Sequence, residues 1–285
     1  MLRRKLVALA LVVGCPSAEL ASMNTASAQK SETQKPRKID VEALRKDLES
    51  GDDARIVPAL ERVAEAGTQA RPLAPQVDAL LRRGVGPKSC VPALQAAGAL
   101  ALPSLSAALS PYVRHRAPAV RRAATSALVK TSGPDAVHAL RVALRSNDPV
   151  VRATAASGLG DIGGKEAVPD LFSALQKGVK ESARSIGQLC ETDDCDKLLE
   201  YFATLPFEVV AAGVDQILFR PSAELADDFK IHVIERLASQ GTPEAAGYLA
   251  DVAQRWSKTS SKRVKKALAA AVKATSSDRS KSGAP

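Results

Sequence analysis

The sequence predicts an all-α protein, a right-handed α-solenoid of about seven helix pairs over residues 39–276. Three observations lead to this prediction. Hydrophobic residues make up 45% of the chain and charged residues 25%, which excludes wholesale disorder. A segment of the chain repeats itself at an offset of 31 residues. Apolar residues recur at helical spacing throughout, and no stretch alternates as a β-strand would.

The N-terminus has the pattern of an export signal. Residues 1–5 include the basic residues Arg3, Arg4 and Lys5, and a short apolar run follows over 6–13. Two processing sites compete. Residues 1–28 form a signal peptide if cleavage follows Ala28, whereas 1–14 form a lipoprotein signal if Cys15 is lipidated. A third alternative is a cytosolic protein whose first residues happen to be apolar.

A polar segment, residues 29–38, follows the signal and is expected to be a flexible spacer. The formal net charge is +9, and it becomes +7 if cleavage after Ala28 removes three basic residues and one acidic residue. This modest excess slightly favours acidic partners and lacks the concentrated charge of most nucleic-acid binders. The expected location is extracytoplasmic, with membrane contact only through a lipid anchor.

Two consecutive segments, Ala117–Leu144 and Asp148–Leu175, align without a gap and are identical at 12 of 28 positions. Each copy predicts a helix, a turn and a second helix. In the second copy, Asp148 is suited to cap the first helix, and the Gly163-Gly164 pair is suited to end it. Neither helix can bury its apolar face alone, so we expect the copies to stack.

The two copies resemble the HEAT repeat, in the short bacterial form known from phycobilisome lyase subunits. The second copy carries most of that family's pattern: Asp148, Pro149, Val151, Arg152, Ala155, Ala156, Leu159, Gly160, Ile162, Gly163, Ala167, Val168, Pro169 and Leu171. The strong match covers about 60 residues, and Gly158 stands where the family has alanine. The resemblance implies a solenoid whose second helices line a concave surface.

Segments on both sides of the two copies also have helical spacing. They are 41–48, 54–65, 73–82, 90–109, 182–188, 197–204, 208–219, 225–239, 243–254 and 262–274. The chain between them is rich in Gly, Pro, Ser and Asp. Residues 277–285 are expected to be a disordered tail.

No motif in the sequence predicts catalysis, a cofactor or a metal site. Gly158–Gly163 matches G-x-G-x-x-G, but a helix precedes it where a dinucleotide site needs a strand, so the glycines are interpreted as punctuation of the repeat. The three histidines lie in no known catalytic or metal-binding motif. We therefore expect no enzyme activity and no cofactor.

Two cysteines, Cys190 and Cys195, flank an acidic turn between expected helices. A short-loop disulfide is the leading interpretation in an oxidising compartment. Two reduced structural cysteines, or a metal or redox role, are the alternatives. Cys90 is expected to be a small core residue.

Basic residues in the repeats define a candidate binding face. By the HEAT resemblance, second-helix residues line the concave surface, and the candidates for binding a protein partner there are Arg141, Arg145, Phe172 and Gln176. Arg114 and Arg116, from a cluster of basic residues, are expected to extend this face. The alternative is an ordinary solvated surface. Arg121 and Arg152 occupy the same repeat position, and we expect each to bond an acidic residue or carbonyl of the neighbouring repeat, as a structural ladder.

The sequence thus predicts a non-enzymatic, exported scaffold that binds a protein along its concave face. Two alternatives stay open. One is nucleic-acid binding by a basic solenoid, against which the export signal and the scarcity of aromatic residues argue. The other is a lyase-type chaperone subunit that acts on a cofactor-bearing protein, implied only by the repeat resemblance.

Overall fold

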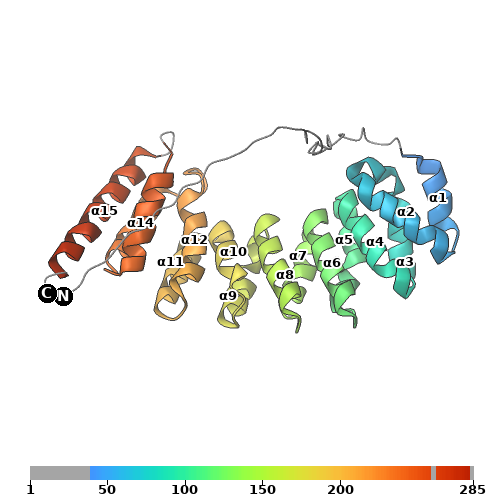
Figure 1. The fold of residues 1–285 in the computed structure, drawn as a ribbon, viewed down its shortest axis with the longest axis horizontal. Helices are drawn as coiled ribbons and strands as arrows, with labels where there is room; N and C mark the ends of the chain where they lie inside the picture. The colour runs from blue at the N-terminus through green and yellow to red at the C-terminus, as the bar shows by residue number, and fades with distance from the viewer. Residues whose placement is uncertain (1–38, 258–260, 283–285) are drawn as a thin grey trace, which may run out of the picture. The chain divides into compact units, whose positions relative to one another are not determined.

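The computed structural model describes residues 39–257 and 261–282, and all regular structure in them is helical (Figure 1). These helices belong to one unit, Lys38–Pro285. The predicted export signal, Ala28, Cys15 and the spacer over 29–38 lie outside the described residues. Among the described helices, none combines the length and the apolar character needed to cross a bilayer.

The helices follow one another through short turns. The N-terminal half contains α1 (Val41–Glu49), α2 (Asp53–Ala66), η1 (Gly67–Leu73), α3 (Ala74–Arg83), α4 (Pro87–Leu100), η2 (Pro103–Leu105), α5 (Ser106–Leu109), η3 (Ser110–Arg114), α6 (Pro118–Thr131) and α7 (Pro134–Ala143). The C-terminal half contains α8 (Pro149–Asp161), η4 (Lys165–Ala167), α9 (Val168–Gln176), α10 (Glu181–Leu189), α11 (Thr192–Glu200), η5 (Tyr201–Ala203), α12 (Phe207–Phe219), α13 (Asp227–Ala238), α14 (Pro243–Arg255) and α15 (Lys262–Ser282).

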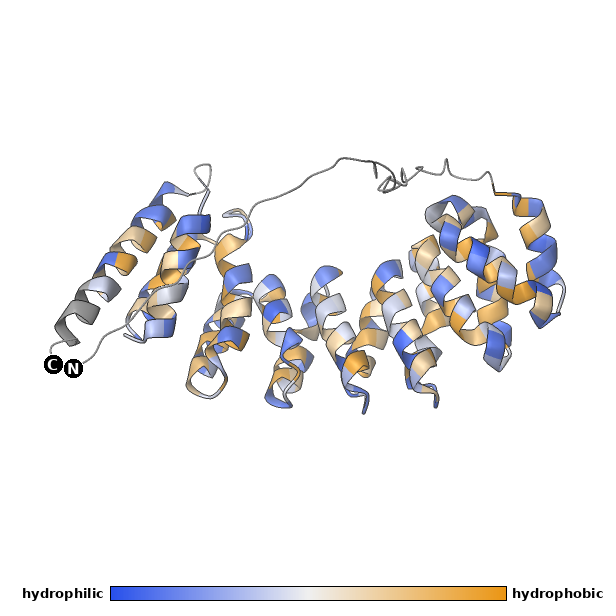
Figure 2. Ribbon diagram, in the orientation of Figure 1, coloured by the Kyte–Doolittle hydropathy of each residue, from blue (hydrophilic) through white to orange (hydrophobic). Residues whose placement is uncertain are grey.

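Local signals explain where the repeat helices begin and end. Asp148 Oδ1 accepts a hydrogen bond from the Val150 amide at 2.9 Å, and Pro149 occupies the first helical position of α8. Gly163, with φ +77°, carries the turn that follows α8. Each helix turns a mostly aliphatic side inward, so that orange and blue alternate around it in Figure 2. The result is an α-solenoid with a core of leucine, valine and alanine.

One helix of each pair packs closely on its counterpart in the next pair. These first helices are α2, α4, α6, α8, α10 and α12. Cα atoms of each one come within 8 Å of Cα atoms of the next. Small residues permit the approach. A Cβ on Gly98 would lie 2.9 Å from the Ala127 Cα, and a Cβ on Gly187 would collide with the backbone carbonyl of Gly213.

Gly158 and Gly160 belong to the same close packing, which corrects their interpretation as repeat punctuation. Both lie inside α8. A Cβ on Gly158 would collide with Val129 of α6, and one on Gly160 would collide with Gln188 and Ser185 of α10. The spacing that mimics a nucleotide motif therefore lets one helix touch both of its neighbours.

Most of the second helices α3, α5, α7, α9 and α11 stand further apart than the first helices. The pairs α3–α5, α7–α9 and α9–α11 come within 8 Å at few Cα positions or none, whereas α7 packs on η3, which continues α5. The candidate site lies at this last junction, between η3 and α7.

This stacking pattern changes after α12. The later helices α13, α14 and α15 pack mainly on one another, and long side chains connect them to the preceding pair. Arg255 of α14 bonds Asp215 of α12 at 2.6 Å, and Arg236 of α13 bonds Asp196 of α11 at 2.6 Å. Between residues 176 and 257, the chain is thus a regular stack only as far as α12.

The last helix is longer than expected. We assigned residues 277–285 to a disordered tail, but α15 continues to Ser282, which corrects that assignment over 277–282. The physical reason is that no Pro or Gly interrupts the chain between Lys262 and Gly283, so the helix propagates one residue at a time from its packed first half.

Candidate binding groove between second helices

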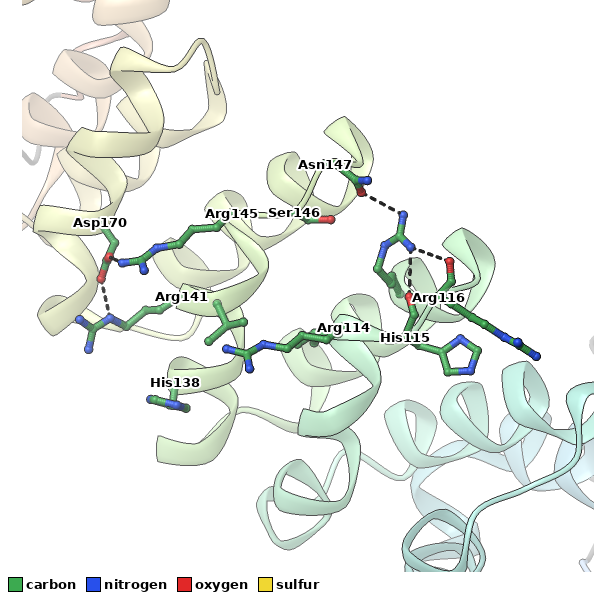
Figure 3. A pocket seen from close by; sticks show the side chains of 12 residues that line it. Arg114, His115, Arg116, His138, Arg141, Arg145, Ser146, Asn147 and Asp170 are labelled. Carbon is green, nitrogen blue, oxygen red and sulfur yellow. Dashed lines mark hydrogen bonds and ion pairs between the residues drawn. The ribbon is translucent and has the colours of Figure 1, made fainter.

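A groove of about 690 Å³ opens between the η3 segment and α7 (Figure 3). Its lining is mostly charged or polar. It contains five arginines, two histidines and one carboxylate: Arg114, Arg116, Arg121, Arg141, Arg145, His115, His138 and Asp170. The remaining lining residues are Val113, Val142, Ser146 and Asn147. With the histidines neutral, the lining has a formal excess of four positive charges.

Three elements place these side chains. Arg114 ends η3, and Arg116 lies in the turn before α6. His138 and Arg141 lie on α7 at i, i+3, and Arg145 follows one turn later, so all three share one side of that segment. Figure 3 shows the Arg114 side chain directed toward α7. Two consecutive repeats therefore contribute to the cationic surface of one groove.

Asp170, in the first turn of α9, holds two of the arginines. Its carboxylate lies 2.6 Å from Arg141 Nε and 3.1 Å from an Arg145 Nη. Burial opposes ionisation of Asp170, but hydrogen bonds from Arg141 and Arg145 outweigh it and hold the pKa of this carboxyl below its usual range. Asp170 is therefore ionised at neutral pH and neutralises part of the charge of the arginine pair.

Two other arginines of the groove, Arg114 and Arg116, are not neutralised in this way. Arg114, Arg116 and His138 are exposed, and within the described chain no hydrogen bond or ion pair engages their side chains. His115 differs, because its Nδ1 accepts a hydrogen bond from the Ala117 amide at 3.1 Å. The groove thus combines two kinds of arginine. Arg141 and Arg145 are held by Asp170 and are called the braced pair, whereas Arg114 and Arg116 are exposed and unbraced.

Arg121 also lines the groove, near the turn before α6. Its Nη1 donates to the carbonyls of His115 at 3.0 Å and Arg116 at 2.9 Å, and its Nη2 donates to Asn147 at 3.3 Å. The equivalent Arg152 donates to the Ser146 carbonyl at 2.9 Å. These arginines hold the turns between repeats, in addition to the charge that Arg121 brings to the groove.

The structure brings together four of the six residues predicted to form the binding face: Arg114, Arg116, Arg141 and Arg145. Phe172 was predicted to lie on this face, but it is buried instead. Its side chain is only 4% exposed, because its ring stacks on Tyr201 at 5.9 Å and the Lys197 ammonium covers it at 4.6 Å. Gln176 is exposed but lies outside the groove, where its amide donates to the Tyr201 hydroxyl at 2.9 Å.

The face predicted from the sequence leaves out His115, His138 and Asp170, which the structure places in the groove. His138 carried a usable signal, since it precedes Arg141 by three residues on the same side of the helix. Nothing in the sequence pattern pointed to Asp170. The matching position in the preceding repeat is Ala139, and its role depends on the contact between α7 and α9 across repeats.

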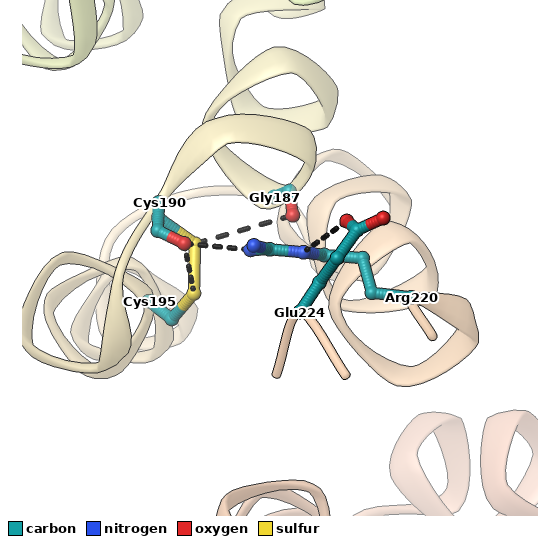
Figure 4. The surroundings of a disulfide bond; sticks show 5 residues. All are labelled: Gly187, Cys190, Cys195, Arg220 and Glu224. Carbon is teal, nitrogen blue, oxygen red and sulfur yellow. Dashed lines mark hydrogen bonds and ion pairs between the residues drawn. A yellow bond between two sulfur atoms is a disulfide. The ribbon is translucent and has the colours of Figure 1, made fainter. Parts of the chain in front are cut away.

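A disulfide joins Cys190, at the end of α10, to Cys195 in α11 (Figure 4). Arg220 donates to the Cys190 carbonyl at 2.6 Å, so the following pair braces the same turn. The buried Lys230 in turn donates to the Arg220 carbonyl, and burial lowers the pKa of its ammonium. Among the described residues Cys90 is a free thiol, buried in α4, and no cluster of three or more potential metal ligands occurs.

The fold and the groove define an α-solenoid with an open, cationic surface between its second helices. Two family models match the chain: HEAT repeats over residues 138–217, and the PBS lyase HEAT-like repeat over residues 120–146. These matches identify the central repeats, residues 120–217, as HEAT repeats. No match was found among the curated proteins.

Two structures with TM-scores of 0.50 or above share the fold. An engineered protein is similar at 21% identity and a TM-score of 0.50, over 83% of this chain and 78% of that one. A chain of a homology model of the full-length AP-3 complex is similar at 14% identity and a TM-score of 0.51, over 81% of this chain and 50% of that one. The complex of CpcE and CpcF of phycocyanin lyase from Nostoc sp. PCC7120 aligns at 16% identity and a TM-score of 0.45, over 88% of this chain and 100% of that chain. At these identities the likeness concerns the fold alone.

Proposed function

We propose that this chain is a non-catalytic, exported scaffold that binds a protein partner along the face formed by its second helices. The observation that carries the proposal is the groove between η3 and α7, where the exposed arginines Arg114 and Arg116 of one repeat face the arginine pair Arg141 and Arg145 of the next. A row of stacked helix pairs offers a long, shallow surface, which suits an elongated protein partner better than a small substrate.

Binding, and not catalysis, is the role that the groove residues favour. Arginine guanidinium groups stay protonated at physiological pH and present several N–H donors, so they hold anionic groups without transferring protons. The braced pair Arg141 and Arg145 has this geometry toward Asp170. A surface of this kind recognises a partner and leaves it chemically unchanged.

Export is supported by two independent features. The first residues combine a basic start with a short apolar run, and the Cys190–Cys195 disulfide is of a kind that persists in oxidising compartments. The mature chain begins at Gln29 after cleavage behind Ala28, or at a lipidated Cys15. The intact mass of the protein from soluble and membrane fractions of its native cells tests this, and an unprocessed chain starting at Met1 contradicts export.

Site-specific photocrosslinking tests the binding face. A benzophenone amino acid is placed at Arg145 or Arg116 in the groove. The matched control carries it at Ser126, which is exposed on α6, the first helix of its pair. We expect one partner protein to be captured from both groove positions and not from position 126. Equal capture at all three positions, or none at the groove, contradicts the proposed face.

A further inference from the structure

We propose that the groove between η3 and α7 receives an acidic segment of the partner protein, bound in an extended conformation, with Asp170 as an intramolecular competitor for its carboxylates. This inference rests on the proposed function and names the chemistry of the partner. It follows from the charge of the groove, from the way Asp170 is held, and from the spacing of the repeats.

Charge comes first. Five arginines and a single carboxylate line the groove. Several of these side chains are well exposed, including that of Arg145 at 77%. An anionic ligand would therefore be attracted by several arginines of the lining. A basic segment would be repelled by them, and a neutral segment would leave their charge unbalanced.

Asp170 shows what the groove does with a carboxylate. Arg141 and Arg145 approach its two oxygens from two successive helical turns, at 2.6 and 3.1 Å. Charge-assisted bonds of this kind are stronger than neutral ones. An aspartate or glutamate of a partner would find the same donors, and it would compete with Asp170 for them. At the η3 side, Arg114 and Arg116 have no such competitor in the described chain.

The spacing of the repeats sets the spacing of the acidic residues. Packed helices lie about 10 Å apart, and an extended chain advances about 3.3 Å per residue. A segment that crosses from the η3 arginines to the α7 arginines therefore meets them about three residues apart. We expect clusters of Glu or Asp at that interval, and not a single terminal carboxylate.

A protein segment is favoured over nucleic acid by what the groove lacks. Single-stranded nucleic acid is usually held by aromatic side chains that stack on the bases as well as by cations. Val113 and Val142 are the apolar residues of this lining, and no Phe, Tyr or Trp is among its described members. Valines can contact the methylene groups of glutamate, but they offer no stacking platform.

Fluorescence anisotropy with labelled peptides tests the inference on the full-length chain. The probe is a 12-residue Gly/Ser peptide with pairs of glutamates three residues apart, and its twin has glutamine at the same positions. We expect the acidic peptide to bind at 50 mM salt, more weakly at higher salt, and the glutamine twin not to bind. Arg114→Gln/Arg116→Gln is expected to weaken binding about tenfold. The matched control is Lys265→Gln/Lys266→Gln, which removes the same charge from exposed positions of α15 and leaves the affinity unchanged.

Equal loss in the two double variants would overturn the inference, because net charge and not the groove would then be responsible. Single-stranded DNA of the same charge is titrated alongside. DNA binding as tight as that of the acidic peptide, with the same loss in Arg114→Gln/Arg116→Gln, would assign the groove to nucleic acid instead.

Asp170→Asn supplies a readout that a purely structural role does not produce. Removing the competing carboxylate is expected to tighten binding of the acidic peptide by about threefold to tenfold, because Arg141 and Arg145 become available to it. Unchanged or weaker binding in a variant with an unaltered circular dichroism spectrum would refute the competitor role. If no acidic peptide binds but crosslinks still form at Arg145 and Arg116, the acidic preference fails and the scaffold function stands. If the peptide binds but no partner crosslinks there, the proposed function fails.

Discussion

Arg121 and Arg152 make the same hydrogen bond in successive repeats. The Nη1 of each donates to the carbonyl of the residue six positions earlier, His115 at 3.0 Å and Ser146 at 2.9 Å. Both carbonyls belong to turns that join a second helix to the next first helix, where the backbone has no helical partner. The repeat arginine is thus a device that fixes the geometry between consecutive pairs.

Replacing Arg152 should therefore destabilise the stack. We expect Arg152→Gln to lower the free energy of unfolding by about 1–2 kcal/mol, because the Ser146 carbonyl loses a charge-assisted donor. Urea denaturation followed by circular dichroism measures this. Arg184→Gln, at an exposed arginine of α10 with no ion pair among the described residues, is the control and should change stability by less than about 0.5 kcal/mol.

The close contact of α10 and α12 makes Gly187 intolerant of any side chain. We expect Gly187→Ala to cost roughly 3 kcal/mol or more, because the added methyl group would meet the Gly213 backbone, which cannot rotate away. Gly247→Ala is the matched variant, since a Cβ there meets nothing within 4 Å in the middle of α14. It should raise stability by about 0.5–1 kcal/mol. Similar effects of the two substitutions would contradict the packing described here.

Loss of the disulfide should have a measurable but limited effect. The loop that Cys190 and Cys195 close is short, with a sequence separation of 5, so the chain-entropy estimate is about 2 kcal/mol. The thermal midpoint of the wild type should fall when reductant is added, and that of Cys190→Ala/Cys195→Ala should not respond. A wild-type midpoint that reductant leaves unchanged would show that the bond adds no stability.

Stability should fall in acid as the braced carboxylates are protonated. Burial opposes ionisation of Asp170 and Asp196, but bonds from Arg141 and Arg145 to the first, and from His232 and Arg236 to the second, keep both pKa values below the ordinary range. A lowered folded-state pKa adds stability that is complete above the unfolded pKa of about 3.9 and is lost as pH falls through the lower folded value.

Denaturant midpoints measured between about pH 5 and pH 2 test this. Asp170→Asn/Asp196→Asn should flatten the decline below about pH 4. Glu61→Gln, at an exposed residue of α2 with no ion pair among the described residues, should leave the decline as steep as in the wild type. An unchanged slope in the aspartate variant would mean that other carboxylates control acid unfolding.

The sequence by itself determined the elements and their repetition. Caps such as Asp148, the turn glycine Gly163 and the i, i+4, i+8 spacing of Val151, Ala155 and Leu159 act within one helix, so their effect can be read from neighbouring residues. The sequence also predicts Arg141 and Arg145 for the binding face from their place in the repeat, and Arg114 and Arg116 from their place in a basic cluster.

Only the tertiary structure decided which residues face a partner and which face the core. Phe172 is covered by Tyr201, Arg141 meets Asp170, and Gly187 lies against Gly213, contacts between residues 26 to 29 positions apart. Each depends on how closely one pair approaches the next, and that distance is set by side chains on both pairs at once. A periodic pattern specifies the apolar side of a helix, but the packing between repeats selects the groove that stays open.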